Sequence, residues 1–192
     1  MRWRGETLSA AHQSKPIFPT IHTWRALVYE KAHPVALEQV VTQDGTTAAD
    51  LDWELYQQGT GELTNINEPY GVIFSRAYRE RLHAGEKLAA YLWTTVVSPD
   101  DREAVLAFGA GGSARVYLNG QEVEAGPAEA LEGTHRMLRD LQKTVPIRLR
   151  AGENTLLVET QPPEEGRPFW YFGGMFLAPE GELALMTDLD FR

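Results

Sequence analysis

Short segments in which apolar and polar residues alternate fill most of the chain from residue 51 onward. Leu51–Leu55 alternates apolar with acidic residues, and clusters of glycine, proline, asparagine and aspartate separate the segments. Alternation with a period of two is typical of half-buried strands, because successive side chains in a strand point to opposite faces. The pattern predicts about nine or ten strands, arranged in an all-β antiparallel β-sandwich or barrel.

The predicted strands differ in how they alternate. Lys87–Val97, the longest of them, is apolar on both faces in its middle, so we expect it to lie in the centre of a sheet. Sandwich cores favour large inward-facing aromatic residues, so Trp93 and Trp53 are expected in the core. Further strands are expected at Tyr70–Tyr78, Ala104–Phe108, Ser113–Leu118, Phe169–Phe176 and Glu182–Thr187.

The dipeptide Asn119-Gly120 predicts a β-hairpin. It is the preferred two-residue type I′ turn, because both of its positions need a positive φ. If the two strands of this hairpin are regular, Val116 faces Val123 on the same side of the sheet. This turn is the clearest local signal in the chain.

A second hairpin is predicted between Val145–Arg150 and Thr155–Glu159, through a turn at residues 151–154. The turn contains glycine and asparagine, which commonly separate two strands of a hairpin. The alternation before it predicts that Ile147 and Leu149 point into the core, while the arginines that follow each of them point to solvent.

The first fifty residues lack this regular pattern. Prolines interrupt them, and a strand is expected only at residues 23–29. They nevertheless contain too many apolar residues for a solvated tail, among them Trp3 and Trp24. We therefore expect residues 1–50 to be an irregular extension that packs on the sandwich of residues 51–192, where it covers a sheet face or edge.

Composition and charge exclude several classes of protein. The 192 residues carry a net charge of −9 and no cysteine. Nucleic acids and anionic membranes bind basic surfaces, so neither is an expected partner. Disulfides, thiolate catalysis and cysteine-ligated zinc are excluded. No segment reads as a signal peptide or a membrane span, so the chain is expected to be soluble, and cytoplasmic unless it belongs to a longer secreted protein.

Three motifs occur in an order that resembles a known family. An aromatic-rich strand ends in Ser98-Pro99, the hairpin follows at Ala114–Gly120, and the pattern L-x-x-G-x-N-x-L-L-V occupies residues 149–158. This order resembles the galactose-binding-like jelly-roll modules attached to glycoside hydrolases and other carbohydrate-active enzymes. The resemblance covers roughly residues 53–178. It implies an antiparallel β-sandwich that binds carbohydrate or braces the catalytic domain of a larger enzyme.

Candidates for sugar binding follow from the late aromatic strand. Alternation sends Trp170 and Phe172 to one face and Phe169 and Tyr171 to the other, so one pair must leave the core unless another segment covers it. We therefore expect Trp170 and Tyr171, together with Arg167, to bind carbohydrate. A loop that precedes a strand supplies further polar candidates, which are Asn65, Asn67, Glu68 and Tyr70.

Acidic turns supply candidates for a structural calcium ion, which the resemblance implies; no other cofactor is expected. Calcium prefers carboxylate and carbonyl oxygens. Asp188 and Asp190 are the first candidates, because the first and last strands of a sandwich are often adjacent, and Asp100 and Asp101 are further ones. The alternative is that these aspartates are solvated charges in turns.

A row of carboxylates raises the question of catalysis. Asp50, Asp52 and Glu54 lie two residues apart, so a strand would carry all three on one face. Some jelly-roll glycosidases use such a row to supply the nucleophile and the acid. The apolar residues between them explain the row equally well as the solvent side of an amphipathic strand, and we expect it not to be catalytic. The five histidines show no metal-binding motif.

The leading hypothesis is a non-catalytic β-sandwich module that binds carbohydrate or braces a carbohydrate-active enzyme. Two alternatives remain open. One is a catalytic jelly roll, either a glycosidase or a polysaccharide lyase, and the other is a structural module that self-associates and has no glycan ligand. Exposed aromatic residues without paired carboxylates beneath them would favour binding, whereas carboxylates that converge in a cleft would favour catalysis.

Overall fold

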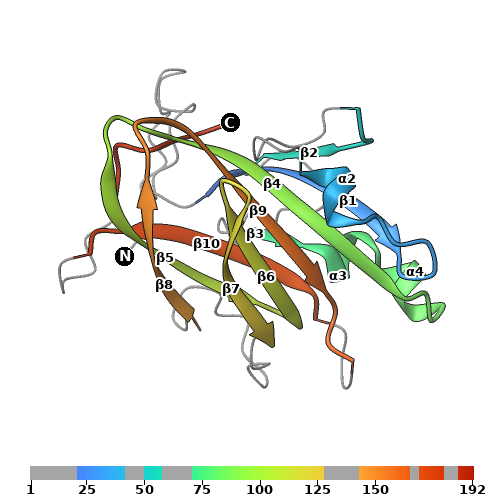
Figure 1. Ribbon diagram of the computed structural model, residues 1–192. Helices are drawn as coiled ribbons and strands as arrows, with labels where there is room; N and C mark the ends of the chain where they lie inside the picture. Colours follow the sequence, from blue (N-terminus) through green and yellow to red (C-terminus); the bar gives the residue numbers. More distant parts are fainter. Residues whose placement is uncertain (1–20, 42–49, 58–70, 128–142, 165–168, 180–185) are drawn as a thin grey trace, which may run out of the picture.

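The computed structural model describes residues 21–41, 50–57, 71–127, 143–164, 169–179 and 186–192. These residues form two antiparallel sheets that pack face to face, as Figure 1 shows. The β-sandwich expected from the alternating pattern is therefore confirmed. Among the described residues, no helix has the length and apolar character that crossing a bilayer requires.

The larger sheet has seven strands. Six of them follow the order β2-β1-β4-β9-β6-β7, and the seventh, β11, pairs with β4 outside this order. β4 lies between β1 and β9, so the central position predicted for the longest strand is confirmed. The strands are β1 (Thr23–Glu30), β2 (Glu54–Gln57), β4 (Leu88–Ser98), β6 (Ser113–Leu118), β7 (Gln121–Pro127), β9 (Gly152–Gln161) and β11 (Asp190–Phe191).

The smaller sheet has four strands in the order β3-β10-β5-β8. The strands are β3 (Gly71–Ile73), β5 (Arg102–Ala110), β8 (Lys143–Leu149) and β10 (Tyr171–Leu177), and the short helices of the chain are α2 (Leu37–Val40), α3 (Phe74–Ala77) and α4 (Arg79–His83). The long strand expected at Tyr70–Tyr78 is therefore wrong after Ile73. Apolar side chains at helical spacing, Phe74, Ala77, Tyr78 and Leu82, pack on the core from α3 and α4 instead.

The core lies between the two sheets and is rich in aromatic side chains. Trp24 of β1 packs edge-on against Phe172 of β10, with ring centroids 5.6 Å apart. Phe172 also stacks on Phe108 at 5.5 Å. All three side chains are at most 2% exposed. Burying aromatic rings of this size supplies much of the stability of a small sandwich.

The strand predicted at residues 23–29 is β1, and it is an internal strand of the larger sheet, between β2 and β4. Just before it, the amide of Ile21 donates a hydrogen bond to the carbonyl of Gly174 in the smaller sheet (3.1 Å). This part of the amino-terminal segment therefore belongs to the sandwich and links its two layers. Residues 1–20 lie outside the described part of the chain.

The connection between β8 and β9 differs from the predicted hairpin. β8 pairs with β5 in the smaller sheet, whereas β9 pairs with β4 and β6 in the larger one. The chain therefore crosses between the layers at Ala151, and the hairpin prediction is wrong. The alternation itself is as expected, because Ile147 and Leu149 are buried and Arg148 and Arg150 are exposed.

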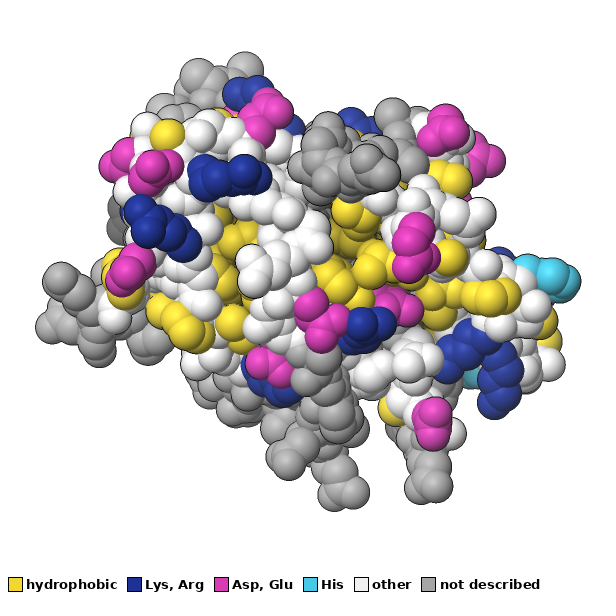
Figure 2. Space-filling model, viewed as in Figure 1, with side chains coloured by type: hydrophobic (Ala, Val, Ile, Leu, Met, Phe, Trp, Pro, Cys, Tyr) yellow, Lys and Arg dark blue, Asp and Glu magenta, His cyan; other side chains and the backbone are white. Residues whose placement is uncertain are grey.

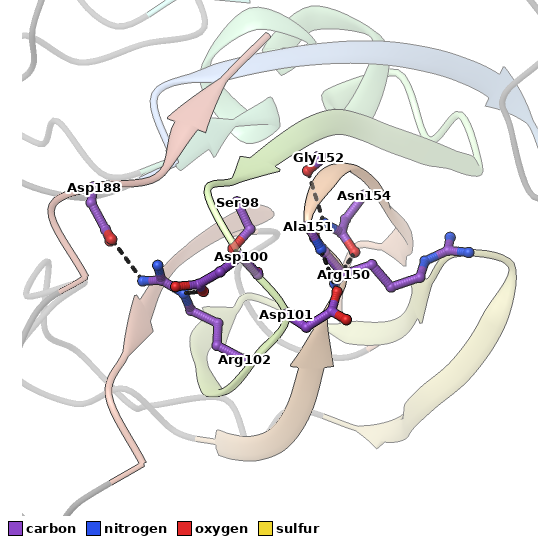
Figure 3. Close-up of polar contacts among 9 residues, drawn as sticks. All are labelled: Ser98, Asp100, Asp101, Arg102, Arg150, Ala151, Gly152, Asn154 and Asp188. Carbon is purple, nitrogen blue, oxygen red and sulfur yellow. Dashed lines mark hydrogen bonds and ion pairs between the residues drawn. The ribbon is translucent and has the colours of Figure 1, made fainter.

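The crossing is held by the buried amide of Asn154, as Figure 3 shows. This side chain is 1% exposed. Its Oδ1 accepts from the amide of Arg150 (3.0 Å), and its Nδ2 donates to the carbonyls of Arg150 (2.8 Å) and Gly152 (3.2 Å). Asp101, at the neighbouring crossing from β4 to β5, accepts from the amide of Ala151 (2.6 Å). Side chains thus replace the backbone partners that a hairpin would have supplied.

The hairpin at Asn119-Gly120 is confirmed. Both residues have positive φ, 51° and 80°, as a type I′ turn requires. The register shifts two residues into the hairpin, where Val116 pairs with Glu124 and Val123 is left as the extra residue. The expected register, with Val116 opposite Val123, is therefore wrong by one position, because a β-bulge interrupts the regular ladder. Both side chains nevertheless pack on the same core cluster, so the expectation that they face the same side is confirmed.

Replacing Gly120 with valine should lower the free energy of unfolding by more than about 1 kcal/mol, because a β-branched residue resists positive φ. Asparagine tolerates this conformation better, so the Gly120→Asn variant should lose less stability. Chemical denaturation of the three proteins measures the difference. Equal stability of the valine variant and the unmodified chain would contradict the turn assignment.

Candidate functional site

Trp170, the first residue expected to bind sugar, is a core residue. Its side chain is fully buried and stacks on Phe74, with ring centroids 4.3 Å apart. Its Nε1 donates a hydrogen bond to the hydroxyl of Thr160 in the other sheet (3.3 Å). A ring enclosed in this way cannot serve as a surface platform for a sugar. Of the two faces that the alternation left open, the one with Trp170 and Phe172 therefore points into the core.

The other residues expected to bind sugar are not gathered into a site by the described structure. Tyr171 points to the outer face of the smaller sheet but is only 7% exposed, and it clusters there with Ile73 and Phe169. Roles for the remaining candidates stay predictions, because they lie outside the described residues; they are Asn65, Asn67, Glu68, Tyr70 and Arg167.

Three of the four aspartates expected to bind calcium are paired with arginines, and the fourth, Asp101, accepts from the amide of Ala151. Arg102 donates to Asp188 (2.7 Å) and to Asp100, as Figure 3 shows, and Arg192 donates to Asp190 (3.1 Å). These hydrogen bonds raise the pKa of the Arg102 guanidinium. Within the described ranges, no three histidine or acidic side chains come together as a metal-binding group. The calcium site therefore stays a prediction.

The row of Asp50, Asp52 and Glu54 is exposed at the edge of the larger sheet, and only Glu54 belongs to a strand. The carboxylate of Glu54 accepts hydrogen bonds from the hydroxyls of Tyr56 and of Tyr78 (3.2 Å). Burial, assisted by the charge of Glu54, raises the pKa of Tyr78 to about 12. The phenol therefore stays protonated and donates to the carboxylate, a role that needs no catalysis.

The outer face of the larger sheet carries a second group of aromatic side chains, which we call the aromatic face. Trp93 of β4 is paired with Leu157 of β9, and Leu157 is paired with Tyr117 of β6. The next row along the same face holds Tyr91, Glu159 and Arg115 in the same order of strands. Figure 2 shows hydrophobic side chains gathered across this part of the molecule, with acidic and basic side chains among them.

Part of the aromatic face lies beneath a covering segment. The hydroxyl of Tyr91 donates to the carbonyl of Val35 (3.1 Å), and Val40 of α2 is fully buried in the same cluster. The rings of Trp53 and Trp93 meet edge to face at 5.7 Å. Both tryptophans therefore lie on the outer side of the sheet, so the expectation that they belong to the sandwich core is wrong.

Charged side chains line the part of the aromatic face around Tyr117. Arg115 donates to Glu122 (2.5 Å) and to Glu159 (3.3 Å), and its guanidinium lies 5.5 Å from the centre of the Tyr117 ring. At the other end of the row, the guanidinium of Arg25 lies 5.2 Å from the Trp93 ring. Each arginine thus covers the face of an aromatic ring.

The phenols of the aromatic face are held in their protonated form. Burial, and then the charge of Glu159, raises the pKa of Tyr29 and of Tyr91. Burial also raises the pKa of Tyr117 to about 12, although the nearby Arg115 lowers it in part. These hydroxyls can therefore donate as well as accept hydrogen bonds at neutral pH.

Known proteins resemble this chain in fold but not in sequence. No protein-family model matches the sequence, and no curated protein matches it. The fold is similar to part of a solved structure, β-glucosidase from Kluyveromyces marxianus in complex with glucose. The TM-score is 0.50 at 13% identity, over 82% of this chain and 16% of that chain.

Two further solved structures give weaker alignments. Selenomethionine-labelled β-glucosidase from Kluyveromyces marxianus aligns with a TM-score of 0.49 at 13% identity, over 81% of this chain and 16% of that chain. The GH31 α-xylosidase from Xanthomonas citri aligns with a TM-score of 0.37 at 10% identity, over 88% of this chain and 15% of that chain. This chain therefore spans 16% of the length of the β-glucosidase chains, and the likeness is one of fold.

Sequence reasoning did not select Tyr117, Arg115 or Glu159. The available signal was the two-sided apolar character of Lys87–Val97, because a strand with apolar residues on both faces must be covered on each side. The sequence does not show which residues of β6 and β9 stand beside Trp93. That information comes only from the strand register.

Proposed function

We propose that this chain is a non-catalytic carbohydrate-binding module of a glycan-processing enzyme. The observation that carries the proposal is the aromatic face, where the partly exposed ring of Trp93 and the buried ring of Tyr117 lie beside charged side chains on one sheet. Sugar rings stack their C–H groups on aromatic side chains, while arginine and carboxylate groups hydrogen-bond the hydroxyls. Concave or flat sites that combine apolar surface with a few polar groups suit such ligands.

The context of a glycan-processing enzyme has two supports. The sandwich resembles part of the β-glucosidase chain in fold, as a domain within a much longer protein would. The order of motifs in residues 91–158 is similar to that of the galactose-binding-like jelly rolls, and the proposal includes this finer assignment. A fold alone does not fix a function, so the aromatic face carries the greater weight.

The purified chain should bind at least one neutral oligosaccharide and should release no reducing ends from it. Isothermal titration calorimetry with cello-, xylo-, laminari- and manno-oligosaccharides tests binding, and a reducing-sugar assay on the same panel tests hydrolysis. The Glu54→Gln variant is the control, because Glu54 belongs to the carboxylate row and lies at the edge of the sheet. Hydrolysis that this variant abolishes would replace the proposal with the catalytic alternative.

A further inference from the structure

We propose that Trp93 and Tyr117 form the two ends of the saccharide platform on the aromatic face, and that the platform selects neutral oligosaccharides. This inference rests on the proposed function and adds to it the residues and the class of ligand. One continuous row across the larger sheet carries it: Arg25, Trp93, Leu157, Tyr117 and Glu122.

The row gives the platform its length. Trp93 and Tyr117 are both paired with Leu157, from opposite sides, so two interstrand spacings separate them. Two such spacings amount to about 10 Å. Leu157 is 1% exposed and forms the floor between the two aromatic side chains. A span of this length is long enough for a disaccharide unit to touch both ends.

Two polar atoms on the platform lack a well-formed hydrogen bond to any described residue. They are the Nε1 of Trp93 and the hydroxyl of Tyr117, and both are buried, with Tyr117 only 3% exposed. Glu122 still acts on the Tyr117 hydroxyl and helps to raise its pKa, so the indole is the stronger of the two observations. A buried polar group without a partner is costly, and such groups in a folded protein call for an explanation. Saccharide hydroxyls would supply the missing partners, since one accepts from an indole and another accepts from or donates to a phenol.

The arginines explain how a ligand reaches these atoms. Arg115 lies over the Tyr117 ring, yet its side chain is 50% exposed. It can therefore swing outward without disturbing the core, and exposed ion pairs such as its contact with Glu159 cost little to break. Arg25 covers the Trp93 ring in the same way. Once displaced, both guanidinium groups remain beside the platform as donors to sugar hydroxyls.

The charges around the platform favour a neutral ligand. Two arginines, Arg25 and Arg115, stand beside two glutamates, Glu122 and Glu159, and Arg115 already contacts both glutamates. The formal charges cancel, so no excess positive charge is available to pair with a uronic acid. An anionic sugar would also meet the two carboxylates directly.

Titration of conservative variants tests the assignment. Tyr117→Phe and Trp93→Phe each remove one of the unpartnered polar atoms, and each should weaken binding of the tightest neutral oligosaccharide about fivefold or more. Thr94→Val is the matched control, because the Thr94 hydroxyl is also buried without a partner but belongs to the strand face opposite Trp93, toward the sandwich core. That variant should bind as the unmodified chain does. Oligogalacturonate should bind at least tenfold more weakly than the neutral probe.

The outcomes separate the two proposals. Weaker binding by Tyr117→Phe and Trp93→Phe, with unchanged binding by Thr94→Val and unchanged melting temperatures, supports the platform. Unchanged binding by the two aromatic variants overturns the platform and leaves the carbohydrate-binding function in place. Tighter binding of oligogalacturonate than of every neutral probe overturns the selectivity. An unmodified chain that binds no saccharide overturns the proposed function and the platform with it.

Discussion

Replacing Trp170 with alanine should lower the free energy of unfolding by about 3–5 kcal/mol, the range for a large aromatic side chain lost from a core. Trp170 is fully buried, stacks on Phe74 and donates a hydrogen bond to Thr160 across the sandwich. The substitution removes contacts with α3 and with β9 of the larger sheet, and it leaves a cavity in the core. Urea denaturation measures the change.

Two further variants serve as controls for that result. Trp170→Phe keeps an aromatic ring against Phe74 and should cost much less than the alanine variant. Leu55→Ala removes a side chain that is 51% exposed, so it should change stability by no more than about 0.5 kcal/mol. If Trp170→Ala is no more harmful than Leu55→Ala, the indole is not part of the core, and its earlier interpretation as a sugar platform would return.

Replacing Asn154 with alanine should lower the free energy of unfolding by about 3 kcal/mol. An unsatisfied buried polar group costs about 1–3 kcal/mol, and several such groups lose their hydrogen-bond partner in this variant. The amide of Asn154 bonds both backbone groups of Arg150 and also accepts from the side chain of Asn119 (3.0 Å). The alanine variant leaves these groups without partners at the point where the chain changes sheets.

Arg150→Ala is the matched control for Asn154. It lies at the same crossing but changes only an exposed side chain, and the backbone groups that Asn154 bonds remain in place. Its effect should stay within about 0.5 kcal/mol. Equal losses in the two variants would show that the amide of Asn154 does not hold the crossing.

The contrast between the two expected hairpins shows which features of the fold can be predicted from the sequence. The Asn119-Gly120 turn is local, because two adjacent residues with positive φ decide it. The segment at residues 145–159 has the same alternation and the same turn residues whether its second strand pairs with the first or crosses to the other sheet. That choice depends on β4, β5 and β6, which supply the partners.

The candidate site was harder to predict for a related reason. In β10 both faces carry aromatic residues, and alternation cannot tell which face is the core. Trp170 precedes that strand and faces inward, where it stacks on Phe74 and donates a hydrogen bond to Thr160. Neither contact can be predicted from the sequence. Similarly, the platform joins Trp93 to Tyr117 through Leu157, and only the register of three strands brings them into one row.

The most direct test is to map saccharide binding onto the chain by nuclear magnetic resonance. The full chain is titrated with the neutral oligosaccharide of the panel that binds most tightly, and backbone amide shifts are followed residue by residue. The account predicts that the largest shifts cluster in β4, β6 and β9, around Trp93, Leu157 and Tyr117. Shifts confined to β3 and β10, or no shifts with any neutral oligosaccharide, would contradict it.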